Sequence, residues 1–246
     1  MSSSFTTINN VDRFVMDFSE LKYKAENYNK NHDSSGKFSS GFGGLTNAQV
    51  DKYSAMAYEN GSDFYRSEFM ERVTKDLKYD GKPGIASSVP KGTKVQYRGW
   101  HDKAHVDSYK NSPDPRLSIG IFGSGLYFTS DIEMASSYTG SANIITGAFV
   151  NKKAKVADAV KLREKMFDAA DKLSGRQNKE RLALKDIKGK IPRVEAQVKL
   201  TQKHNNENKL FTDLGAYAAI RGYDIIQAPG EIVVLNRSMI TFVEVQ

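Results

Sequence analysis

The sequence predicts an α+β fold, in which helices come first and short strands follow. Helical patterns of apolar residues fill most of the chain before residue 81, and short apolar segments dominate from residue 94 onward. Most of these segments do not alternate polar and apolar residues, so we favour α+β over a doubly wound α/β sheet. The length of 246 residues suits one large domain, or one domain with a small appendage.

The first 44 residues predict a helix and a linker. Apolar side chains recur at steps of three and four residues from Val11 to Tyr28, which indicates an amphipathic helix. Residues 32–44, HDSSGKFSSGFGG, are rich in Gly and Ser and predict a flexible linker. The D-x-x-G-K-F tract inside it resembles a short tract of phage head-associated proteins, which implies a phage origin.

The main domain is predicted over residues 45–246, and its helical part over 45–85. In LTNAQV, Thr46 is placed to cap a helix while Gln49 reaches back, and Leu45 is placed to pack on Val50. That helix should end before Gly61, and a second one should run over about residues 63–78.

Six strands are predicted from apolar and β-branched runs. They are residues 94–100, 125–130, 143–150, 223–226, 231–236 and 240–245. A helix over about residues 211–221 should lead into the fourth strand.

The net charge of +7 comes from one segment, because residues 151–210 contain 17 Lys and Arg against 8 Asp and Glu. One helix is predicted there, and Gly189 and Pro192 should interrupt the chain after it. Five apolar residues share a face of that helix: Ala159, Leu162, Met166, Ala169 and Leu173. The basic insertion is either a solvated helical segment or a surface for an acidic partner or nucleic acid. Few aromatic residues interrupt it, so the stacking residues of a single-strand-binding groove are missing.

Several classes of protein are not favoured. Without cysteine the chain has no disulfide, cysteine nucleophile or thiolate metal site. No stretch approaches the roughly 18 apolar residues of a membrane helix, and MSSSFTTINN lacks the features of a secretory signal. No glutamate follows His101 as a metalloprotease helix ending at His105 would require, so we expect no metal site.

Three predicted strands carry residues that suit a binding site. In YRGW, Arg98 can fork onto a phosphate while Gly99 allows close approach to the backbone. In GSGLYFTSD, Gly123 and Gly125 precede an aromatic pair and two hydroxyls. In EIVVLN, Glu231 begins a strand that is otherwise apolar.

Taken in this order, the three motifs resemble the toxin-like branch of the ADP-ribosyltransferase superfamily. Gly-Tyr-Asp at residues 222–224 is similar to a tripeptide of phage-encoded members. The resemblance covers about residues 90–150 and 208–246. It implies two short packed β-sheets that form an NAD cleft, to which the preceding helices and the basic insertion are added.

The resemblance also implies roles in binding NAD. Arg98 would pair with an NAD phosphate, and the backbone of Gly99 would bind the nicotinamide carboxamide. Tyr127 would flank the nicotinamide ring, with Tyr138 as a second candidate. Gly123 and Gly125 would keep the pocket wall low.

The remaining roles concern catalysis. Thr129 and Ser130 would brace the pocket and orient the catalytic glutamate, Glu231. Departure of nicotinamide leaves an oxocarbenium-like ribose, which a carboxylate stabilises if it acts more strongly there than on bound NAD. The implied activity is transfer of ADP-ribose from NAD, with no metal, by a phage effector in the host cytoplasm, which it could reach by injection from the phage particle.

Two positions depart from the family pattern. Phe128 stands where toxin-like members have serine, and Pro229 stands where arginine-modifying members have Glu or Gln. The acceptor stays open among protein, nucleic acid and water. The alternative function is a non-enzymatic phage particle protein that binds nucleic acid through residues 151–210.

Overall fold

The computed structural model describes residues 45–58, 66–79, 81–112 and 118–243. The chain divides into two units, residues 1–39 and 40–246, and every described residue belongs to the second. The helix and linker predicted within residues 1–44 lie outside the described residues, as does the predicted helix end before Gly61.

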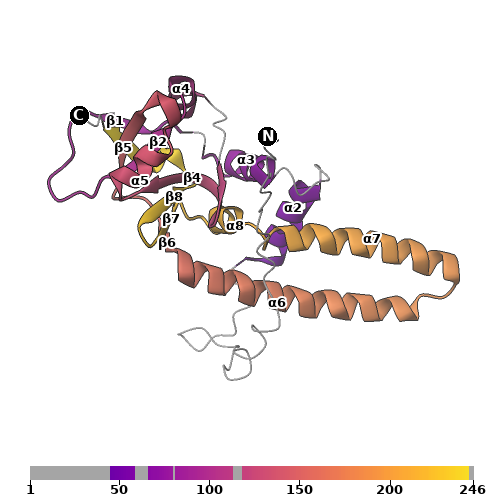
Figure 1. Cartoon of the computed structure of the whole chain (residues 1–246). Coiled ribbons are helices and arrows are strands. Elements are labelled where there is room, and N and C mark those ends of the chain that lie inside the picture. The colour runs from indigo at the N-terminus through magenta and orange to yellow at the C-terminus, as the bar shows by residue number, and fades with distance from the viewer. Residues whose placement is uncertain (1–44, 59–65, 80, 113–117, 244–246) are drawn as a thin grey trace, which may run out of the picture. The chain divides into compact units, whose positions relative to one another are not determined.

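The described chain is mixed α/β, with helices both before the first strand and between later strands (Figure 1). The α-helices are α2 (Asn47–Tyr58), α3 (Arg66–Asp76), α4 (Lys103–Asn111), α5 (Ile132–Ser137), α6 (Ala159–Ala183), α7 (Lys190–Lys209) and α8 (Leu214–Ile220). The short 3₁₀ helices are η2 (Gly140–Ala142), η3 (Leu184–Asp186) and η4 (Arg237–Met239).

Nine strands of the described chain form one mixed sheet. They are β1 (Gly84–Ala86), β2 (Gln96–Trp100), β3 (Ser118–Gly120), β4 (Gly123–Thr129), β5 (Ile144–Val150), β6 (Val156–Asp158), β7 (Ile225–Ala228), β8 (Glu231–Val234) and β9 (Ile240–Val243). Their order is β1-β9-β5-β2-β4-β8-β7-β6, and β3 pairs with β4 beyond the end of β2. The β1–β9 and β6–β7 pairs are parallel, and the others are antiparallel.

The sheet curls until its two halves pack on each other. β4 and β9 are three strand positions apart, which in a flat sheet would separate them by about 14 Å. Yet the ring centroids of Phe128 and Phe242 are 6.1 Å apart. The expected pair of sheets is therefore one hydrogen-bonded sheet, and the single residue pair Tyr97–Thr129 joins its halves.

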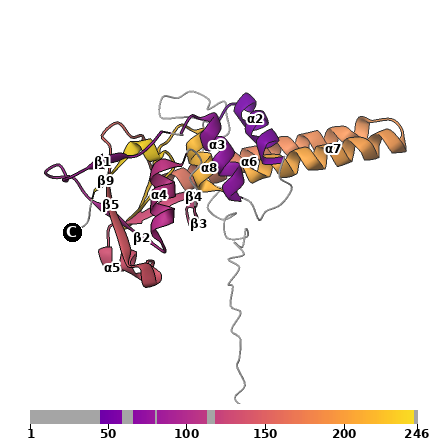
Figure 2. The same ribbon diagram turned by 90° about the horizontal axis from the view of Figure 1, so that it is seen from above.

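Two hydrophobic clusters cover the two faces of the sheet. The inner cluster fills the concave side and consists of Trp100, Val106, Tyr109, Leu126, Phe128, Ala148, Ile225, Ile232, Val234, Ile240 and Phe242. The outer cluster joins β6, β7 and β8 to α2, α3, α6 and α8, and includes Val73, Leu162, Tyr217, Ile226 and Val233. α3 packs beside α8, and α2 packs beside α3 and α7 (Figure 2).

The predicted start of α2 is confirmed. The backbone N–H of Gln49 donates to Thr46 Oγ1 at 3.2 Å, and that of Thr46 donates to Gln49 Oε1 at 2.9 Å. Leu45 and Val50 are both fully buried, as expected for a hydrophobic staple.

The basic insertion forms an antiparallel pair of helices, α6 and α7, which lie side by side in Figures 1 and 2. The face predicted for α6 is confirmed, because Ala159, Leu162, Met166, Ala169 and Leu173 are all buried. The predicted interruption at Pro192 is wrong. Gly189 caps α7, and proline is tolerated in its first turn because backbone N–H groups there have no helical partner.

Candidate functional site

Glu231 is the first residue of β8, in the middle of one half of the sheet (Figure 1). A two-residue turn, Pro229–Gly230, joins β7 to β8, and Gly230 has a φ of 75°. Proline followed by a positive-φ glycine is the preferred sequence of a type II turn. The turn pairs Ala228 with Glu231, and on the other side Thr129 of β4 faces Glu231.

Hydrogen bonds fix the backbone on both sides of Glu231. The carbonyl of Gly230 accepts from the Ser130 N–H at 2.8 Å, from Ser130 Oγ at 3.1 Å and from Thr129 Oγ1 at 3.3 Å. The side-chain amide of Gln227 donates to the Glu231 carbonyl at 3.1 Å. Thr129 and Ser130 therefore brace the residue before the glutamate, rather than its carboxyl group.

The carboxyl group of Glu231 is half-buried and makes no hydrogen bond or ion pair within the described chain. Burial raises the pKa of Glu231 above the ordinary glutamate value, because an ionised carboxylate loses solvation. A carboxyl group that is partly desolvated and has no structural partner is characteristic of functional sites.

Tyr127 shares a sheet face with Glu231. Tyr127 of β4 pairs with Val233 of β8, which belongs to the outer cluster. The next pair on the same face is Thr129 with Glu231, because side chains two residues apart in a strand point to the same side. The Tyr127 hydroxyl donates to the Gly123 carbonyl at 2.6 Å and accepts from the Phe122 N–H at 3.1 Å. Burial raises the pKa of Tyr127, and the hydrogen bond from the Phe122 N–H lowers it. The negative charges of Asp213 and Glu231 raise this pKa further.

Arg98 lies on the opposite face. Its guanidinium carbon is 4.8 Å from the ring centroid of Trp100, which belongs to the inner cluster. Nη1 donates to the Tyr127 carbonyl at 2.8 Å, and Nη2 donates to Ser118 Oγ at 3.1 Å. Nε is buried without a partner in the described chain. Arg98 thus ties β2 to β4 and β3, and the structure does not bring its guanidinium to the face that carries Glu231.

Protein atoms fill the space beside the predicted pocket glycines. A Cβ on Gly123 would collide with Asp213 and the start of α8, and one on Gly125 would collide with Val233. In the structure, Gly123 and Gly125 allow neighbouring parts of the protein to pack closely, and the space beside them is not open to a ligand. A Cβ on Gly99 would meet the Ala135 carbonyl of α5, and the backbone role of Gly99 stays a prediction.

Tyr138 ends α5 and is 61% exposed, so it lies at the surface. Asp131 caps this helix by accepting from the Glu133 and Met134 N–H groups at 2.9 and 3.2 Å. The sulfur of Met134 is 3.5 Å from Thr129 Oγ1, which places the start of α5 beside the Thr129–Glu231 pair.

Sequence reasoning missed Ser118 and Gln227. Ser118 belongs to β3, a three-residue strand that has no readable period of its own. Gln227 donates hydrogen bonds to the carbonyls of Ala228 and Glu231. The second of these bonds can be expected only when the turn between β7 and β8 is known. The turn sequence Pro-Gly was the signal that could have shown it.

Within the described ranges, no three His, Asp or Glu side chains are grouped so that they could hold a metal ion. None of the described helices combines the length and the hydropathy needed to span a membrane. Comparison of the chain with protein-family models, curated proteins and solved structures finds no match.

Proposed function

We propose that this chain is an NAD-dependent mono-ADP-ribosyltransferase, which cleaves the nicotinamide–ribose bond and transfers ADP-ribose to a macromolecular acceptor. The observation that carries the proposal is the half-buried Glu231 carboxyl, which has no hydrogen-bonding partner among the described residues and lies where the sequence motif expects it. The motif resemblance further supports a phage effector that acts on a host target in the host cytoplasm.

The proposed chemistry uses the charge of Glu231. When nicotinamide leaves, positive charge develops on the ribose, and a carboxylate hydrogen-bonded to a ribose hydroxyl stabilises that charge. A carboxylate already bound to an arginine or lysine would be less available for this. Hydrogen bonds fix the backbone on both sides of Glu231, which limits the positions that its carboxylate can reach before the reaction.

The other residues divide into two groups. Tyr127, Thr129 and Ser130 lie close enough to Glu231 to shape its surroundings, by shared face, by pairing and by the Gly230 carbonyl. Arg98 would reach NAD only along the edge of β4 between β2 and β3, where its Nη atoms lie. The proposal therefore depends on Glu231 more than on Arg98.

The test is release of nicotinamide from NAD by the purified chain, measured by liquid chromatography. Glu231→Gln should lower the rate by about a hundred- to thousand-fold while NAD affinity, measured by calorimetry, stays near that of the parent. Glu164→Gln, at an exposed position of α6, is the control and should keep the parent rate.

Two outcomes would count against the proposal. A folded Glu231→Gln variant that turns NAD over at the parent rate would remove Glu231 from the reaction. Absence of NAD turnover together with DNA binding that weakens steeply with salt would favour the non-enzymatic alternative. If the chain does turn NAD over, labelled NAD added to host lysate would identify the acceptor.

A further inference from the structure

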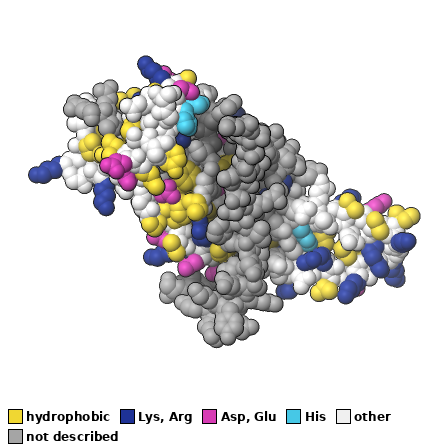
Figure 3. Space-filling view, viewed as in Figure 1, with side chains coloured by type: hydrophobic (Ala, Val, Ile, Leu, Met, Phe, Trp, Pro, Cys, Tyr) yellow, Lys and Arg dark blue, Asp and Glu magenta, His cyan; other side chains and the backbone are white. Residues whose placement is uncertain are grey.

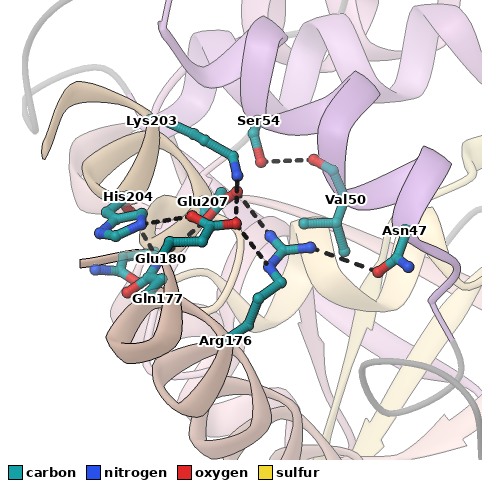
Figure 4. Close-up of polar contacts among 10 residues, drawn as sticks. Asn47, Val50, Ser54, Arg176, Gln177, Glu180, Lys203, His204 and Glu207 are labelled. Carbon is teal, nitrogen blue, oxygen red and sulfur yellow. Dashed lines mark hydrogen bonds and ion pairs between the residues drawn. The ribbon is translucent and has the colours of Figure 1, made fainter. Parts of the chain in front are cut away.

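The α6–α7 pair is fixed near its base by a partly buried polar cluster (Figure 4). Glu207 of α7 is 1% exposed, and it accepts from Arg176 Nη2 at 2.6 Å and from Gln177 Nε2 at 3.0 Å. Glu180 of α6 in turn accepts from Lys203 at 2.7 Å and from His204 at 2.8 Å. These directional contacts set the register of the two helices.

Beyond this cluster, the distal segment (residues 181–200) leaves apolar side chains exposed. On α7, Ile191, Val194 and Val198 are 73%, 52% and 61% exposed. Their spacing of three and four residues places them on one face of the helix, as a continuous aliphatic stripe. In α6, Leu182 is also 54% exposed.

The opposite side of α7 is incompletely packed as well. A shallow, open groove of about 400 Å³ lies between α6, η3 and α7. Its apolar walls include Ala183, Leu184, Ile187, Ala196 and Leu200. The distal part of α7 therefore gains little burial from the rest of the described chain on either side.

The distal segment is strongly basic (Figure 3). Its cations are Arg181, Lys185, Lys188, Lys190, Arg193 and Lys199, and its anions are Asp186 and Glu195. Helical geometry puts Lys190 on one border of the aliphatic stripe, and Lys199 and Glu195 on the other. Neither Lys190 nor Lys199 makes a hydrogen bond or ion pair within the described chain.

We propose that the aliphatic stripe of α7 is a docking surface for an acidic amphipathic helix of a partner protein. Aliphatic side chains of the partner would cover Ile191, Val194 and Val198, and its carboxylates would face Lys190 and Lys199. The mode is that of two helices packed along apolar faces, with charges at the borders fixing orientation.

Other occupants fit less well. The distal segment contains no aromatic residue for stacking on bases, and phosphates do not cover aliphatic side chains. Helices that lie in membrane interfaces usually carry Trp or Phe on a wide apolar face, and this stripe has neither. A second copy of the chain would bring another basic segment against this one, and the two would repel.

The experiment selects binders from a displayed library of 15-residue peptides on the immobilised full chain. Selected peptides are then measured by fluorescence anisotropy against Val194→Gln/Val198→Gln and Lys190→Glu/Lys199→Glu. Because all four side chains are exposed, both variants should keep the parent Tm. Lys152→Glu/Lys153→Glu, which changes exposed lysines outside the distal segment, is the control.

We expect selected peptides to combine Asp and Glu with aliphatic residues at helical spacing. Their Kd should rise at least about tenfold on Val194→Gln/Val198→Gln, which corresponds to the loss of roughly one buried aliphatic contact. It should also rise on Lys190→Glu/Lys199→Glu, because like charges then face each other, and it should not change on the control. Recovery of no binders, of basic peptides, or of binders that ignore the Val194/Val198 change would overturn the proposal. So would duplex DNA or phosphatidylserine vesicles that lose affinity with that change while the peptides do not. The measurement needs no NAD turnover.

Discussion

The carboxyl group of Glu231 is half-buried without a hydrogen-bonding partner in the described chain, so ionising it in the folded protein costs free energy. Its pKa is raised on folding. The stability that this group contributes is therefore present below its unfolded pKa and is lost as pH rises through its folded pKa. At neutral pH the ionised Glu231 therefore lowers the stability of the folded protein.

Glu231→Gln should therefore keep or raise the stability of the protein at neutral pH. The amide removes the charge and keeps the shape, so the desolvation cost of the carboxylate disappears. Thermal unfolding at pH 7.5 is the measurement, and the Tm of the variant should equal or exceed that of the parent. A marked fall in Tm would show that Glu231 has a structural role that its contacts do not reveal.

The same pKa sets the acid limb of activity. If ionised Glu231 stabilises the ribose cation, kcat for nicotinamide release should fall as pH drops through the raised pKa. The midpoint should lie above about 4.3, the value of glutamate in short peptides. A pH series between 4 and 8, limited to conditions in which the Tm exceeds the assay temperature, would measure it. An acid limb at or below the ordinary value would contradict the assignment.

Arg98 contributes to the fold through both Nη atoms, because it connects β2 to β4 and β3. Lysine offers one point charge and cannot reproduce the forked contacts. Arg98→Lys should therefore lower the Tm, and NAD affinity measured well below that Tm should fall as well. If the Tm falls and NAD affinity does not, Arg98 stabilises the sheet and does not bind the NAD phosphate.

At the scale of the element, the α6–α7 pair depends on the buried carboxylate of Glu207. Glu207→Ala removes the acceptor of Arg176 and Gln177 and should destabilise the protein by about 3 kcal/mol, typical of breaking a buried ion pair. The measurement is chemical unfolding. Glu195→Ala, an exposed position of the same helix, should change the free energy of unfolding by less than about 0.5 kcal/mol.

A second charge relationship makes the pair sensitive to acid. Burial disfavours ionisation of Glu180, but hydrogen bonds from Lys203 and His204 outweigh it and lower the pKa of the Glu180 carboxyl. A lowered folded pKa gives stability that is present above the unfolded pKa and is lost as pH falls through the folded one. Acidification should therefore lower the stability of the α6–α7 pair, whereas protonation of Glu231 favours the folded state.

Elements with a local physical cause could be predicted from the sequence. The capping box at Thr46 and the buried face of α6 are set by neighbours in the chain, and both are as expected. β1, β3 and β6 are three residues long and exist because another strand is beside them, so no local period announces them. The same limit applies to the site. Glu231 stood out as a charge opening an apolar run, whereas the face on which Arg98 lies depends on how the sheet curls.

At the scale of the whole molecule, Leu45 packs the start of α2 against the rest of the fold. This residue is fully buried in the outer cluster, and Thr46 caps α2 directly after it. We therefore predict that a chain able to fold alone must include Leu45 and Thr46, and that its boundary lies at about Gly44.

Two truncated chains test this boundary. A chain that begins at Gly44 should keep the Tm and any NAD turnover of the full chain. A chain that begins at Asn47 loses the cap, worth about 1 kcal/mol, and a buried leucine, worth roughly 1.5–3 kcal/mol. Its Tm should be clearly lower. If the Gly44 chain folds with the parent Tm but loses turnover, residues before it take part in the reaction.

The two-residue turn before Glu231 has a consequence for how this protein can evolve. Side chains alternate between the faces of a strand, so an inserted or deleted residue that shifted β8 by one position would turn Glu231 toward the inner cluster. A change of length at this position must therefore be absorbed by a bulge or a longer loop that leaves the pairing of β8 with β4 intact. Loops that no site residue follows directly are free of this constraint and are better placed to vary in length.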